Sequence, residues 1–182
     1  MIEQTMLIGG QAVGASNGAT FDRLNPLDGS VATRAPAATV EDAVRACEAA
    51  AAAFPAWSQI GPNARRALLM KASQALEAKG DAIAAAMAAE TGASGIWAGF
   101  NVHLSASMLL EAASLTTQIN GEIIPSDVPG SVAMAVRQPA GVVLGIAPWN
   151  APVILAVRSI STALACGNTV ILKGSELCPA TH

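Results

Sequence analysis

Two apolar runs in the second half of the chain end in polar side chains whose chemistry suits a binding or catalytic site. The run GVVLGIAP leads into Trp149 and Asn150, and the run NTVILK ends in Lys173, with Ser175 and Glu176 close behind. An asparagine amide can donate a hydrogen bond to an oxygen that gains negative charge. A lysine ammonium donates to hydroxyl or phosphate groups, and a glutamate carboxylate accepts from ribose hydroxyls. These side chains therefore point to a shared ligand site.

Each of these residues also has a structural interpretation. Asn150 stands where a strand is expected to become a helix, with Pro152 in the first turn, so it is either an N-cap or a donor to an oxyanion. Lys173 is either a solvated lysine or a ligand of hydroxyl or phosphate groups. Position alone leaves both pairs of alternatives open.

A strand–helix–strand unit over residues 141–173 would bring the two runs together. Both runs are continuously apolar, as is typical of strands buried on both faces, and the segment APVILAVRSISTALACG between them has the length of a helix. Such a unit joins parallel strands by a right-handed crossover. Ligands bind beyond the carboxyl ends of parallel strands in open sheets, so the expected fold class is α/β with its site at this edge.

In the first part of the chain, the sequence pattern predicts short strands followed by helices. Residues 6–36 read as strands joined by turns at Gly9–Gly10 and Asp28–Gly29. A capping box of Thr39 and Asp42 opens the first of four alanine-rich helices.

The second helix begins after Gly61, and the third and fourth are expected over residues 81–92 and 97–119. In the second helix the residues expected on the buried face are Leu68, Leu69, Ala72 and Leu76. Residues 121–138 read as two strands around the turn SDVPG.

Composition narrows the class of protein. The chain has 182 residues, a net charge of −3 and no basic cluster, so no nucleic-acid partner is expected. No apolar run reaches the roughly 18 residues of a membrane-spanning helix. The three cysteines are widely spaced, which favours reduced thiols and a cytoplasmic location, and His103 and His182 match no metal-ligand spacing. Only 13% of residues are charged, which favours burial of apolar faces against a partner subunit or a further domain.

The combined run PAGVVLGIAPWNAPV…ALACGNTVILKGSE resembles the aldehyde dehydrogenase superfamily. The segments NPLDGSV, FPAWSQIGPNARRALLMKASQALEA, ETGAS and NGEIIP fall in the family's order, so the resemblance spans nearly the whole chain. One departure is Gly174, where the family usually has proline. Within the family, GASGIWAGFNVH, VRQP, KGSE and CPATH look most like the salicylaldehyde dehydrogenases of bacterial aromatic catabolism.

The resemblance implies the N-terminal part of the aldehyde dehydrogenase fold, with a helical segment, the start of a Rossmann-like parallel sheet and an oligomerisation arm. Residues 1–120 would be strands and helices of the cofactor-binding domain, 121–138 the oligomerisation strands, and 139–182 the first βαβ unit. The catalytic domain, with the family's cysteine nucleophile and glutamate base, would lie beyond this chain. The whole protein is expected to be a homo-oligomer, a dimer or a tetramer.

The same resemblance implies roles for the strand ends. Asn150 would stabilise the oxyanion formed when a cysteine attacks an aldehyde. The nicotinamide side of the cofactor groove would be lined by Ile146, Ala147, Pro148 and Trp149. Lys173, Ser175 and Glu176 would hold the adenosine ribose. A carboxylate near the 2′-hydroxyl favours NAD, although NADP stays possible.

Helical spacing also predicts which residues of the helix after Asn150 would face the aldehyde. Positions 151, 155 and 158 share one face of the helix after Asn150, so Ala151, Leu155 and Arg158 would face the substrate. Arg158 would then pair with a hydroxyl or carboxylate of an aromatic aldehyde, or else with a structural carboxylate. Trp97 and Phe100 are either aromatic walls of the pocket or core residues.

Two functions remain in competition. The first is NAD(P)-dependent oxidation of an aromatic aldehyde to its carboxylate by the full-length protein, with this chain inactive by itself. The second is a non-catalytic truncated module that binds nucleotide or partner subunits. Cys166 is expected to be a packing residue rather than a substitute nucleophile.

Overall fold

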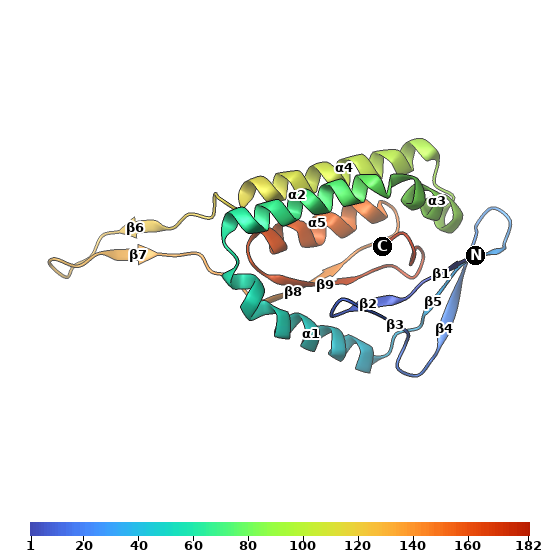
Figure 1. The fold of residues 1–182 in the computed structure, drawn as a ribbon, viewed down its shortest axis with the longest axis horizontal. Helices are drawn as coiled ribbons and strands as arrows, with labels where there is room; N and C mark the ends of the chain where they lie inside the picture. Colours follow the sequence, from blue (N-terminus) through green and yellow to red (C-terminus); the bar gives the residue numbers. More distant parts are fainter.

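The computed structural model describes residues 1–182 and is built around a parallel pair of strands. Strand β8 (Val142–Ile146) pairs with β9 (Thr169–Lys173), and helix α5 (Pro152–Ala165) connects them. Helix α5 packs on one side of the pair and α1 (Val40–Gln59) on the other (Figure 1). The predicted βαβ unit is confirmed.

Three further helices form a layer beyond α5. Helices α2 (Pro62–Ala78) and α4 (Gly95–Leu115) run side by side over α5, and α3 (Gly80–Thr91) packs at one end of α4 (Figure 1). The largest buried apolar cluster joins α2, α4 and α5 through Leu69, Leu109, Ala112, Ala113, Val157 and Ala165. Four helices were predicted in this part of the chain, and the fourth begins and ends a little earlier than expected because Ser94 caps it at Trp97 N.

The prediction for the buried face of α2 is confirmed for Leu69 and Leu76, which belong to or pack against the core, and is wrong for the other two residues. Leu68 is 45% exposed and Ala72 is exposed too, whereas Arg65, Leu69 and Ser73 are buried. The two polar residues are tolerated in the core because each donates to a backbone carbonyl. Arg65 Nε lies 3.1 Å from Ala165 O, and Ser73 Oγ lies 2.9 Å from a carbonyl of α4.

The N-terminal strands follow the predicted turns. They are β1 (Ile2–Glu3), β2 (Met6–Ile8), β3 (Gln11–Val13), β4 (Thr20–Leu24) and β5 (Val31–Pro36). Strands β2 and β3 form a hairpin across Gly9–Gly10, and β4 and β5 form another across the turn that contains Gly29. The predicted capping box of Thr39 and Asp42 is present at the start of α1.

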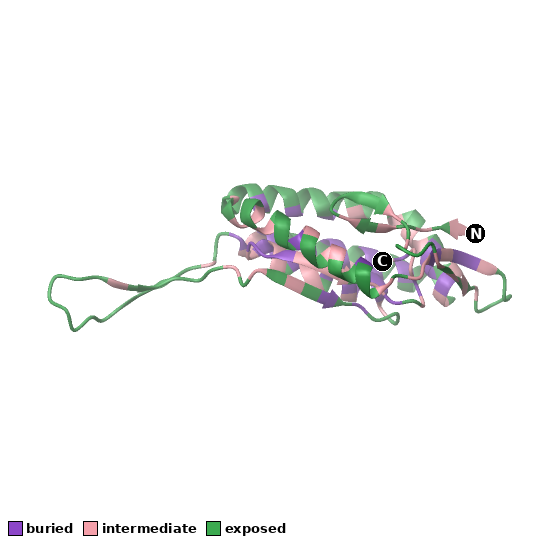
Figure 2. Ribbon diagram, turned by 90° about the horizontal axis from the view of Figure 1, so that it is seen from below, coloured by how far each residue is buried: buried purple, intermediate pink, exposed green.

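Strands β6 (Glu122–Ile124) and β7 (Ala133–Ala135) form an antiparallel hairpin that projects from the body of the molecule (Figure 1). Its surface is almost entirely exposed (Figure 2). The exposed side chains include apolar ones, such as Ile123 at 78% and Met134 at 65%. No helix of the chain combines the length and the apolar character needed to span a bilayer.

The prediction that β8 is buried on both faces is wrong for this chain. Val142, Leu144 and Ile146 are exposed, while Gly145 is buried against α5. The cause is the position of α1, which packs mainly against β9 and leaves this face of β8 uncovered.

The C-terminal turn of α5 is held by side chains from three other parts of the chain. Carbonyl groups at the end of a helix have no partners within the helix and need others. Here the donors are Asn168 Nδ2 to Ala163 O at 3.0 Å, Trp57 Nε1 to Leu164 O at 3.3 Å, and Arg65 Nε to Ala165 O at 3.1 Å. Asn168 Oδ1 also accepts from the backbone N–H groups of Ala140 and Gly141, at 2.7 and 3.0 Å, just before β8.

Asn168 therefore fixes the start of β8 against the end of α5. Replacing Asn168 with alanine removes one donor and an acceptor of two bonds, so we expect the free energy of unfolding to fall by about 2–3 kcal/mol. Urea denaturation would measure the change, with the exposed Asn63→Ala as the matched control. An equal effect of the two substitutions would contradict this assignment.

Gly145 sets how closely α5 approaches the sheet. A Cβ atom at this position would overlap Ser159 Oγ and would lie 3.0 Å from Ser159 Cβ and 3.1 Å from Ile160 Cγ2. We expect Gly145→Ala to lower the free energy of unfolding by about 1–3 kcal/mol, because α5 must move away from β8. The control is Gly99→Ala in α4, where an added Cβ meets no neighbour and alanine favours the helix.

Candidate active site and cofactor rim

The two strand ends that the sequence singled out lie next to each other. Ile146 is opposite Lys173 in the parallel register, and Ala147 N donates to Lys173 O at 3.0 Å. After Lys173 the chain turns, and Lys173 Nζ lies 3.7 Å from a carboxylate oxygen of Glu176. Both charged groups are exposed, at 59% and 70%, so they are available to a ligand. We call residues 173–176 the cofactor rim.

The other residues predicted to bind the cofactor differ in how far they are exposed to solvent. Ile146, Pro148 and Trp149 are exposed, and Ala147 is buried. Ser175 is buried as well, and its hydroxyl accepts from Leu177 N at 3.2 Å, so it shapes the turn of the rim.

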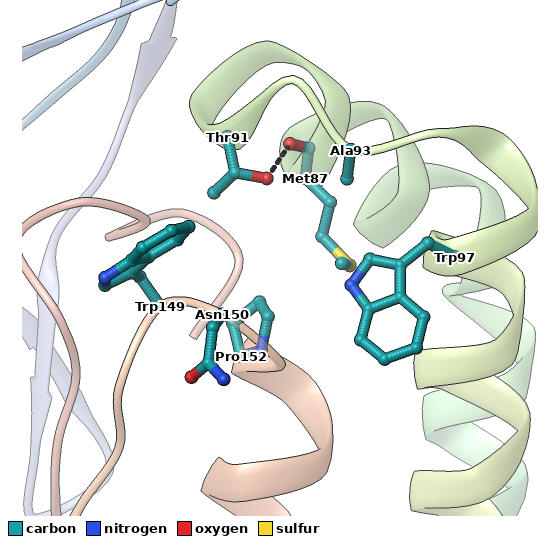
Figure 3. Close-up of a pocket in the computed structure, with 7 residues that line it drawn as sticks. All are labelled: Met87, Thr91, Ala93, Trp97, Trp149, Asn150 and Pro152. Carbon is teal, nitrogen blue, oxygen red and sulfur yellow. Dashed lines mark hydrogen bonds between the residues drawn. The ribbon is translucent and has the colours of Figure 1, made fainter.

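A pocket of about 110 Å³ lies beside this edge, between the start of α5 and the end of α3. Trp149, Asn150 and Pro152 face Met87 and Trp97 across it (Figure 3). The remaining lining residues are Thr91 and Ala93. Two tryptophans and an asparagine therefore border one cavity.

Asn150 does not cap α5. The N-cap position is Ala151, and no side chain accepts a hydrogen bond there. The N-cap interpretation of Asn150 is therefore wrong, because the helix begins two residues later, at Pro152. The exposed amide of Asn150 has no partner within the chain and lines the pocket.

The residues predicted to contact the substrate are only partly brought together. Trp97 lines the pocket, and Phe100 stacks on it with ring centroids 5.6 Å apart. Ala151, Leu155 and Arg158 do not line this cavity. They do share the partly exposed side of α5, as helical spacing requires. Arg158 forms no ion pair, so no structural carboxylate of this chain neutralises it.

Four lining residues were missed from the sequence: Met87, Thr91, Ala93 and Pro152. The first three surround the end of α3, where Gly92 adopts φ +70° and reverses the chain. Thr91 Oγ1 donates to Met87 O at 2.7 Å, as Figure 3 shows. The available signal was the glycine after a helix, which marks a turn but not what the turn faces.

Glu90, also on α3, connects the pocket to the segment that follows the cofactor rim. Its carboxylate is fully buried and accepts from Ala180 N at 2.8 Å, Thr181 N at 3.0 Å and Thr181 Oγ1 at 2.7 Å. Arg23 binds the backbone carbonyl of the same residue at 2.6 Å. The end of α3 and residues 180–181 therefore form one hydrogen-bonded unit.

Cys178 and His182 lie inside this unit but lack the electrostatics of a catalytic pair. Cys178 Sγ is 3.4 Å from His182 Nδ1. Burial, with the charge of Glu90, raises the pKa of the Cys178 thiol to about 12. Burial also lowers the pKa of His182. Cys178 is therefore a neutral thiol at physiological pH and no nucleophile.

Comparisons with known proteins agree with this geometry. The model of the aldehyde dehydrogenase family matches residues 13–182. A vanillin dehydrogenase of Pseudomonas fluorescens is 61% identical over the whole chain, and a salicylaldehyde dehydrogenase of Pseudomonas putida is 49% identical over 93% of it. The crystal structure of a salicylaldehyde dehydrogenase from Pseudomonas putida G7, complexed with salicylaldehyde, superposes with a TM-score of 0.96 and 46% identity over all of this chain.

The chain covers only part of each of these proteins. It spans 38% of the vanillin dehydrogenase, 35% of the salicylaldehyde dehydrogenase and 38% of the solved structure. The family match and the superposition nevertheless extend across the strand ends, the pocket and the rim. The chain belongs to the aldehyde dehydrogenase family.

Proposed function

We propose that this chain is the N-terminal segment of an NAD-dependent dehydrogenase that oxidises an aromatic aldehyde, of the salicylaldehyde type, to its carboxylate. The observation that carries the proposal is the exposed, unpartnered amide of Asn150 in a pocket between Trp97 and Trp149. Indole rings suit a flat aromatic ring, because offset and edge-to-face contacts stabilise such pairs. The relatives named for vanillin and salicylaldehyde support the same substrate class.

Asn150 acts on the aldehyde oxygen. When a thiolate attacks the carbonyl carbon, a carbon–sulfur bond forms and an electron pair moves onto the oxygen. A carboxamide N–H placed at that oxygen stabilises the negative charge as it develops. The attacking cysteine and the glutamate base of the family belong to other parts of the whole protein.

Lys173 and Glu176 would hold the adenosine ribose of the cofactor. Their charged groups are exposed and adjacent at the carboxyl end of β9, where dinucleotides bind in open α/β sheets. The ammonium donates to the ribose hydroxyls, and the carboxylate accepts from them. Glu176 favours NAD over NADP, because a 2′-phosphate would meet a like charge. When bound, the nicotinamide ring supplies the hydride acceptor.

The β6–β7 hairpin provides the contact with other subunits. Both of its short strands expose apolar side chains, which suits pairing with a second copy of the chain in a dimer or tetramer. The 182 residues alone are expected to turn over no aldehyde, because Cys178, the cysteine nearest the rim, stays protonated.

Replacing Asn150 with alanine tests the oxyanion role. We expect kcat of the whole enzyme to fall about 10²–10³-fold, because one donor to the oxyanion is lost. Steady-state oxidation of salicylaldehyde with NAD would measure it. Asn120→Ala, at an exposed asparagine away from the pocket, is the matched control and should leave kcat unchanged. A full rate in Asn150→Ala would overturn the assignment.

Replacing Arg158 tests which aromatic aldehydes the enzyme prefers. Its guanidinium is exposed and unpaired on the side of α5 that carries Ala151 and Leu155. We expect Arg158→Leu to raise KM for salicylaldehyde about tenfold and to leave KM for benzaldehyde unchanged, because only the first offers a ring oxygen to the guanidinium. The exposed Arg66→Leu on α2 is the control. Equal changes for the two aldehydes would rule out contact with a ring substituent.

A further inference from the structure

Gly174, in the middle of the cofactor rim, lies so close to His182 that a side chain at this position would press against the histidine. A Cβ atom built on Gly174 would lie 3.0 Å from His182 Cβ, and 3.2 Å from both Cγ and Nδ1 of the ring. The φ angle of Gly174 lies outside the left-handed region, so backbone conformation does not require glycine here. The restriction is steric and comes from His182, through its Cβ atom as well as its imidazole ring.

The imidazole also binds the rim through a hydrogen bond. Ser175 N donates to His182 Nδ1 at 3.2 Å. Nδ1 must therefore carry a lone pair, and the proton of the neutral ring lies on Nε2, which is buried without a partner. One ring thus fills the space beside Gly174 and fixes the orientation of the next peptide group.

The position of His182 is itself fixed. Its backbone N–H donates to Cys178 O at 3.3 Å, and the preceding residue, Thr181, is held by the buried carboxylate of Glu90. Residues 174–182 therefore form a closed turn that is anchored on α3 and that ends with an imidazole against its own beginning.

We propose that His182 is a positioning residue for the cofactor. It stands in for the missing side chain at position 174 and sets the backbone of the rim, so that Lys173 and Glu176 are presented to the adenosine ribose. The inference rests on the proposed cofactor site. It adds that residues 174 and 182 act as a coupled pair: a larger residue at 174 requires a smaller one at 182.

A double-mutant cycle in the whole dehydrogenase tests this pair. The variants are His182→Ala, Gly174→Ala and the double variant, with the exposed His103→Ala of α4 as control. We expect His182→Ala and Gly174→Ala each to raise KM for NAD about fivefold, with kcat and KM for the aldehyde unchanged within about twofold. Gly174→Ala should have a smaller effect, about twofold, when position 182 is already alanine, since the two ring contacts are then gone and only the Cβ contact remains. His182→Asn, whose amide oxygen can accept from Ser175 N, should restore part of the affinity for NAD.

Three results would overturn the inference. An unchanged KM for NAD in both single variants would show that the pair does not position the rim. The proposed function would stand in that case, because it rests on Asn150 and on the activity of the parent enzyme. Independent effects of the two substitutions would show that they are not coupled. A parent enzyme that neither binds NAD nor oxidises an aldehyde would overturn the proposed function and this inference with it.

Discussion

The three carbonyl groups at the end of α5 are the point on which the rest of the structure depends. Each is bound by a side chain from a different part of the chain: Trp57 of α1, Arg65 of α2 and Asn168 at the start of β9. Ala163 O and Leu164 O also accept backbone N–H groups, so each side-chain bond contributes about 0.5–1.5 kcal/mol and ties α5 to another part of the chain. Together these bonds hold both neighbouring helices and both strands around α5. The opposite end of that helix then has a defined position, and there the chain presents Asn150.

A second constraint connects the pocket that Asn150 lines with the cofactor rim. Glu90 is buried only because three donors of residues 180–181 satisfy its carboxylate. It stands one residue before Thr91 and three after Met87, both of which line the pocket. The wall of the pocket and the turn behind the rim are consequently parts of one hydrogen-bonded frame. An enzyme that must bring a substrate carbon and a cofactor into register gains from such a frame, because small displacements reduce rate strongly.

Local patterns in the sequence predicted what local physics determines. The turns at Gly9–Gly10 and Asp28–Gly29, the capping box and the βαβ unit rest on neighbouring residues or on hydrophobic periodicity. The errors concern partners far away in the chain. Arg65 and Ser73 were not predicted to be buried, because the carbonyl groups that accept their hydrogen bonds lie 100 and 33 residues away in the sequence. The side of α3 that lines the pocket could not be predicted, because this alanine-rich helix has no clear apolar face. The roles of Asn150 and the rim were predicted from family motifs rather than from geometry.

The β6–β7 hairpin has a further thermodynamic consequence. An isolated two-stranded ribbon is marginal in water, and this one pairs only three residues on each strand. At its base, a Cβ atom on Gly121 would overlap Ala135 O, so close approach of the strands requires glycine here. Glycine also adds to the conformational entropy of the unpaired chain. In the proposed oligomer, a neighbouring subunit would supply the ordering free energy as well as the contact. Substitutions that stiffen the ribbon would tighten association without touching the partner, by reducing the entropy lost on assembly.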